Sequence, residues 1–223
     1  MRTAALGLAA PALLALAAAA CHDNSPNTCF ESNATRYTYW LGGDTTLVFH
    51  WPASRMPVRT YAEPTGATPA NVAAGLQIWA NAFHCHELSF LPVTDSTQAD
   101  VIVRPVAALP PQPARAVSLR ADSVGICTGR TDGVFDSTLT LTGPVRSYIA
   151  PMGGVTDSVA LAGCFRMTTT HELGHAIGIL GHSPDPGDIM YTTPKRSDLS
   201  PNDRYTAQKL YHTTATIRPA PRP

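Results

Sequence analysis

The chain has 223 residues, of which 44% are hydrophobic and 14% are charged, a composition ordinary for a folded globular protein. Its 16 Lys and Arg residues balance its 16 Asp and Glu residues, so the formal net charge is zero. The sequence contains no basic run and no basic helix face, which excludes nucleic acid as an expected partner. The length suits one domain with a substantial core, and we expect a monomer.

The first twenty residues, MRTAALGLAAPALLALAAAA, have the pattern of a secretory signal peptide. Arg2 is their one charge, and an Ala/Leu run follows that ends in small residues suited to cleavage. Cys21 comes next, as in a bacterial lipobox, where this cysteine becomes the lipidated first residue and anchors the protein to a membrane. Leucine is usual three positions before the cysteine, where this chain has Ala18. We therefore expect an exported bacterial protein, either an envelope lipoprotein or a secreted protein with Cys21 as an ordinary thiol.

The cysteine count supports lipidation, because five cysteines are an odd number for an exported chain. Without Cys21, four remain that can form two disulfides in an oxidising compartment: Cys29, Cys85, Cys127 and Cys164. Three connectivities are open. We expect these cysteines to be structural rather than catalytic.

Residues 21–44 read as a tether or N-terminal arm, and 45–212 as one catalytic-type domain. Thr68-Pro69 opens a helix whose apolar stripe runs from Val72 to Phe83. This helix ends near His84-Cys85-His86. That trio could bind a metal, but a helix end pinned by a disulfide with a histidine on either side is the favoured interpretation.

The remaining elements follow from alternation, turn residues and caps. ALPPQPARA (108–116) reads as a surface loop, and Thr131-Asp132-Gly133 as the turn of a hairpin. The Pro-rich end, 213–223, reads as a disordered tail. The expected strands are 47–51, 56–64, 88–93, 99–106, 124–127 and 134–141, and the expected later helices are 157–179 and 199–211.

Residues 171–183, HELGHAIGILGHS, carry the chemistry. His171 and His175 stand four apart, so a helix places both imidazoles on one face, where they suit zinc. Glu172 lies one residue further round, the position of a general base acting on a metal-activated water. Gly178 lets the chain turn back and bring His182 from the far side. Alone, the short motif is also found on solvated helix faces.

This stretch resembles the metzincins, zinc endopeptidases with an HExxHxxGxxH motif and a downstream Met-turn. It looks closest to the matrixin-like branch, in which HS precedes DP and MY. The resemblance implies an α+β or α/β fold, with a twisted mixed sheet packed on a first helix and a long active-site helix, plus a C-terminal helix. It also implies zinc on His171, His175 and His182, catalysis by Glu172, and Met190 as the Met-turn methionine.

One departure concerns the third ligand. The family has two residues between the glycine and the third histidine, whereas this chain has three: Ile179, Leu180 and Gly181. The interval from His182 to Met190 is nevertheless the matrixin-like one. We therefore expect His182 to bind the metal through a tolerated insertion, with Asp185 and Asp188 as fallback ligands.

Other family features bear on regulation and substrate. No PRCGxPD-like cysteine switch is present and the N-terminal arm is short, so we expect no latency through a cysteine, with Cys29 as the one alternative left open. Tyr191 follows Met190 directly and reads as structural. Metzincins often bind Ca²⁺, but the sequence shows no loop of spaced carboxylates. We expect a polypeptide substrate to pair with an edge strand at 124–128.

The expected function is therefore a zinc metalloendopeptidase. The alternative is a catalytically inactive envelope lipoprotein that keeps zinc for structure or uses the site as a binding module. An intact Glu172 and an open fourth metal position favour the enzyme, since structural zinc sites usually have four protein ligands.

Overall fold

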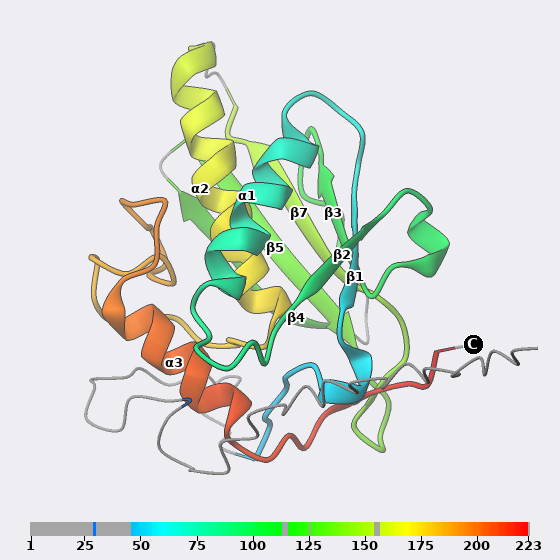
Figure 1. Cartoon of the computed structure of the whole chain (residues 1–223). Helices are drawn as coiled ribbons and strands as arrows, with labels where there is room; N and C mark the ends of the chain where they lie inside the picture. The colour runs from blue at the N-terminus through cyan, green and yellow to red at the C-terminus, as the bar shows by residue number, and fades with distance from the viewer. Residues whose placement is uncertain (1–28, 30–45, 113–115, 125, 154–156, 223) are drawn as a thin grey trace, which may run out of the picture.

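The computed structural model describes residue 29 and residues 46–112, 116–124, 126–153 and 157–222, with the backbone alone for 116–124 (Figure 1). The predicted signal peptide, Cys21 and nearly all of the N-terminal arm lie outside the described residues. Within the described part, no helix is both long enough and apolar enough to cross a membrane.

A six-stranded sheet forms the centre of the domain, in the order β2-β1-β3-β7-β5-β4. Strands β1, β2, β3 and β7 run parallel to their neighbours in this group, and β5 is antiparallel to both β7 and β4. The free edge beyond β5 is therefore β4. The strands are β1 Val58–Ala62, β2 Phe90–Val93, β3 Val101–Pro105, β4 Ala116–Val124, β5 Cys127–Val134 and β7 Val145–Pro151.

Two helices, α1 Thr68–Ala80 and α2 Ser158–Ala176, pack together against the sheet (Figure 1). The predicted stripe of α1 is buried at Val72, Leu76 and Trp79. Gly75 lets the two helices approach closely, because a Cβ there would lie 2.7 Å from Leu173 Cδ1. Helix α3, Pro201–Tyr211, begins with a capping box between Ser200 and Asp203. Short 3₁₀ turns occur at Ala53–Arg55 and Ser96–Gln98.

This arrangement confirms the predicted fold class, a mixed sheet with two packed helices and a C-terminal helix. The hairpin is predicted at the wrong place in the chain. Thr131, Asp132 and Gly133 lie inside β5, and the hairpin joins β4 to β5 near residue 126. Val124 and Cys127, within the predicted edge segment 124–128, therefore pair with each other across the hairpin, while the sheet edge is β4 itself.

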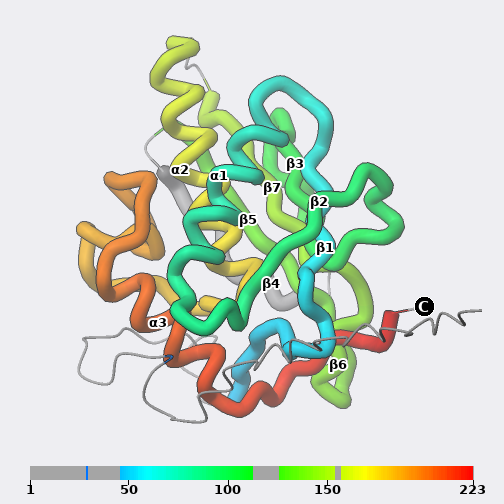
Figure 2. The backbone as a smooth tube through the Cα atoms, in the orientation of Figure 1, coloured from blue at the N-terminus to red at the C-terminus, as the bar shows by residue number. Residues whose placement is uncertain are grey.

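The prediction of a disordered tail at 213–223 is also wrong, because residues 213–222 pack onto the domain (Figure 2). Strand β8 (Arg218–Pro219) pairs with β6 (Thr140–Leu141), and Ile217 is buried against Phe49. Arg222 forms an ion pair with Asp100 at 2.5 Å. Backbone pairing and this ion pair hold a segment whose proline content alone favours disorder.

Two disulfides are present in the structure, Cys29–Cys85 and Cys127–Cys164. The first pins the chain just after α1, as favoured for the His84-Cys85-His86 trio. It also removes Cys29 as a latency thiol, because the sulfur is bonded to Cys85. The second joins the start of β5 to α2.

The turn after α2 depends on Gly178, which has φ +119°. A Cβ at this position would overlap the carbonyl oxygen of Phe49. Both the backbone conformation and the available space therefore require glycine.

We expect Gly178→Ala to lower the free energy of unfolding by at least about 2 kcal/mol, because it adds backbone strain and a clash. Urea denaturation of the purified domain measures the change. Gly143→Ala is the matched control, since nothing lies within 4 Å of a Cβ there. Equal urea midpoints for the two variants would contradict this account of the turn.

Candidate metal centre

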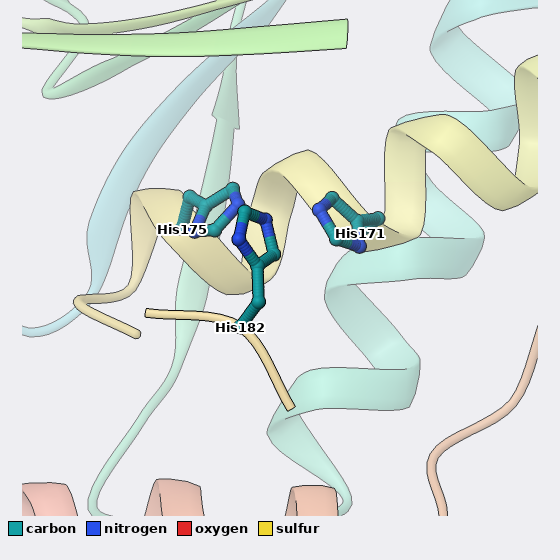
Figure 3. A group of neighbouring side chains, drawn as sticks. All are labelled: His171, His175 and His182. Atoms are coloured by element: carbon teal, nitrogen blue, oxygen red, sulfur yellow. The ribbon is translucent and has the colours of Figure 1, made fainter. Parts of the chain in front are cut away.

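Helix α2 presents His171 and His175 one turn apart on the same face, and both side chains are fully buried. His182 approaches from the chain beyond the turn, so the three rings point toward one another (Figure 3). The ring centroids of His182 lie 5.4 Å from His171 and 5.0 Å from His175. One ligand atom from each ring lies within 4.8 Å of the others. The inserted residue therefore does not keep His182 from the cluster.

Two backbone carbonyls orient the helix histidines. His171 Nδ1 lies 2.6 Å from the carbonyl oxygen of Ile189, and His175 Nδ1 lies 2.5 Å from that of Ile179. A carbonyl oxygen only accepts, so each Nδ1 carries the proton and donates it. Nε2 of each ring is then the nitrogen with a lone pair that can bind a cation.

This donor set fits zinc. Three imidazoles with a fourth position left for water or substrate are a common catalytic arrangement for this metal. The fallback ligands are engaged in the turn instead: Asp185 accepts from the amide of Gly187 at 2.8 Å, and Asp188 accepts from the Ser183 hydroxyl. The cluster in the described part of the chain contains neither carboxylate.

Glu172 is fully buried between α2 and β5. The Thr131 hydroxyl donates to its Oε2 at 2.6 Å. Gly129 leaves space for the other oxygen, because a Cβ there would overlap Glu172 Oε1. The Glu172 carboxylate thus lies against β5.

Met190 lies beneath the histidine helix. Its side chain is fully buried, and it would overlap a Cβ placed at Gly174, the residue directly before His175. The turn that carries it is closed by a backbone bridge between Ser183 and Tyr191. Tyr191 thus contributes backbone pairing to this turn.

Asp203, on α3, anchors the same turn. Its carboxylate accepts from the amides of Ile189 at 2.9 Å, Met190 at 3.3 Å and Ser200 at 2.8 Å. Burial raises the pKa of Asp203, and the amide donors from Ile189 and Ser200 act against this rise. Since the Ile189 carbonyl holds His171, α3 supports the metal centre through this carboxylate.

Sequence reasoning missed three residues around the site. Thr131 and Gly129 lie more than 40 positions before Glu172, and no local pattern relates them to it. Asp203 did have a signal, because Ser200 with an acidic residue three positions later is a capping pattern. Its second role on the Met190 turn depends on tertiary structure.

Comparison with known proteins gives a partial match over this region. Residues 156–212 match the family model described as Matrixin. This segment is matrixin-like. Human matrilysin (Homo sapiens) is 44% identical over 61 residues, which are 25% of this chain and 22% of matrilysin. The chain therefore matches less than a quarter of that relative's length, and the matched family segment includes α2, the histidines, the Met190 turn and α3.

We expect His182→Ala to weaken zinc binding at least about a hundredfold, because it removes one of three ligands. Competition with a chromogenic chelator measures the affinity. His212→Ala is the matched control, since that histidine lies at the end of α3 and pairs with Glu87. Equal zinc affinity in the two variants would remove His182 from the ligand set.

We expect Asp203→Asn to destabilise the domain by about 2–3 kcal/mol, because the asparagine NH₂ group would face backbone N–H groups that need an acceptor. Zinc affinity should fall with it, since the Ile189 carbonyl shifts. Thermal unfolding with and without zinc measures both effects. A variant with parental stability and affinity would show that Asp203 does not support the centre.

Proposed function

We propose that this protein is a zinc-dependent metalloendopeptidase. The observation that carries the proposal is the convergence of His171, His175 and His182 beside a buried glutamate on the same helix. The matrixin match over residues 156–212 supports it. The proposed catalytic unit comprises residues 46–222.

His171, His175 and His182 would hold zinc as neutral imidazoles, and the metal would supply Lewis acidity that polarises a peptide carbonyl and lowers the pKa of an attacking water. Glu172 then acts as general base: it takes a proton from the water and delivers it to the leaving amine. No covalent intermediate with the protein is required. Met190 forms the apolar floor of the site.

The polypeptide substrate is proposed to lie extended along the free edge of the sheet next to β5, where backbone groups can pair with it. That edge is β4. Its register with β5 shifts between Ser118 and Ala121, so the irregularity lies opposite Thr131, which contacts Glu172. Bulges of this kind often occur beside active sites.

Export fits this function. Two disulfides are consistent with an oxidising, extracellular compartment. Secretion through residues 1–20, and lipidation at Cys21 as an alternative to free release, remain predictions from the sequence.

The second candidate is a non-enzymatic envelope protein that uses zinc for structure. It predicts that chelation lowers the unfolding temperature while the parent protein cleaves no peptide. The endopeptidase proposal predicts that chelation abolishes cleavage and that added zinc restores it. Metal content, unfolding temperature and casein hydrolysis, measured on one preparation, separate the two.

We expect Glu172→Ala to reduce casein or peptide cleavage by about 10²–10⁴-fold, the usual contribution of a general base. Zinc content should equal that of the parent, because Glu172 is not a ligand. Cleavage that persists at the parental rate would refute the enzyme proposal.

A further inference from the structure

Thr131 lies 41 residues before Glu172 and reaches it across the interface between β5 and α2. Its side chain is fully buried, and its hydroxyl lies 2.6 Å from Glu172 Oε2. We propose that Thr131 is the positioning residue that aims the Glu172 carboxylate. The inference rests on the proposed function, in which Glu172 is the general base.

The hydrogen bonds around Thr131 have one consistent direction. Its oxygen lies 2.8 Å from Ser147 Oγ, 3.1 Å from the Glu172 carbonyl oxygen and 2.6 Å from Glu172 Oε2. The carbonyl and carboxylate oxygens of Glu172 are both acceptors toward Thr131, which has one proton to donate, so Ser147 is the donor to Thr131 among these three contacts. Thr131 donates its one hydroxyl hydrogen bond to the closest acceptor, Glu172 Oε2. The chain therefore runs from Ser147 through Thr131 to the carboxylate.

The strand also fixes the second carboxylate oxygen. Gly129 and Thr131 are two positions apart, so both face the same side of β5. Thr131 bonds Oε2, and the missing side chain of Gly129 makes room for Oε1. A glutamate side chain has three rotatable bonds, and one hydrogen bond at Oε2 together with the space beside Gly129 for Oε1 favours one orientation.

The support behind this contact is rigid. Thr131 and Ser147 are direct cross-strand partners on β5 and β7. The disulfide between Cys127 and Cys164 ties the start of β5 to α2. The hydroxyl is thus held at a fixed position relative to the helix that carries Glu172.

Removal of the hydroxyl should misplace the base without removing the metal. Thr131→Val keeps the shape, and we expect kcat to fall about ten- to a hundredfold with KM within about twofold. Thr131→Ser retains the hydroxyl and should recover most of the parental kcat. Zinc content should stay parental in both variants.

Thr168→Val is the matched control. Thr168 is fully buried on α2, one turn before Glu172, and its hydroxyl has no hydrogen-bond partner. The same substitution there should leave kcat and zinc content parental. Ser147→Ala removes the donor to Thr131 but leaves the contact to Glu172, so we expect a several-fold loss of kcat.

Crystal structures of the zinc-loaded parent and Thr131→Val variant give a readout independent of turnover. We expect the Glu172 carboxylate to leave the Gly129 side of β5 in the variant, while the three histidines keep their positions. An unmoved carboxylate, or a parental kcat for Thr131→Val, overturns the inference. So does a kcat loss that Thr131→Ser fails to recover. If Thr131→Val does not fold, a parental kcat for Ser147→Ala also overturns it.

The activities of these variants separate the proposed function from the positioning role of Thr131. If the parent and Glu172→Ala cleave peptides equally, the proposed function fails. If Glu172→Ala is inactive while Thr131→Val remains parental, the function stands and the positioning role fails.

Discussion

The candidate metal centre depends on two hydrogen bonds from imidazole Nδ1 groups to backbone carbonyls. The Ile179 carbonyl comes from the turn that ends α2, and the Ile189 carbonyl comes from the turn that carries Met190. Each turn therefore orients one helix histidine as well as directing the chain. The centre forms only when the helix end and the Met190 turn adopt their folded conformations together.

The surroundings of α2 follow from this requirement. Its last nine residues are all buried, including His171 and Glu172. Trp79 of α1 donates to the Thr170 carbonyl at 2.8 Å, and Trp51 donates to the Ala176 carbonyl at 2.9 Å. Buried polar groups on a helix are costly unless paired. Here indole donors, neighbouring carbonyls and the Thr131 hydroxyl supply partners for several of these groups, whereas the Thr168 hydroxyl has none.

The sequence predicted what is encoded locally. Helical spacing located both helix histidines, the first helix and the capped last helix, because each depends on residues a few positions apart. Contacts between distant segments were not predictable in this way. Thr131, Gly129 and the β4–β5 pairing bring together residues far apart in the chain.

The misplaced hairpin has a physical cause. Thr131-Asp132-Gly133 has the composition of a turn, yet these residues lie in an interior strand. Asp132 is buried and accepts from the Arg130 guanidinium at 2.9 Å, which satisfies part of its charge. This ion pair thus stabilises a turn-type residue inside the strand. The C-terminal tail was predicted to be disordered for a similar reason. Its proline content favours disorder, but Ile217 pairs with Phe49 and Arg222 forms an ion pair with Asp100.

The Cys127–Cys164 disulfide joins β5, whose Thr131 contacts the Glu172 carboxylate, to α2, which carries His171 and His175. Closing a loop of this size contributes about 3–4 kcal/mol by restricting the unfolded chain. A chain made in a reducing cytosol would lack this link and its contribution to stability. If the protein is the exported endopeptidase proposed above, peptide hydrolysis would begin only after passage into an oxidising space, which would spare the proteins of the cell that makes it.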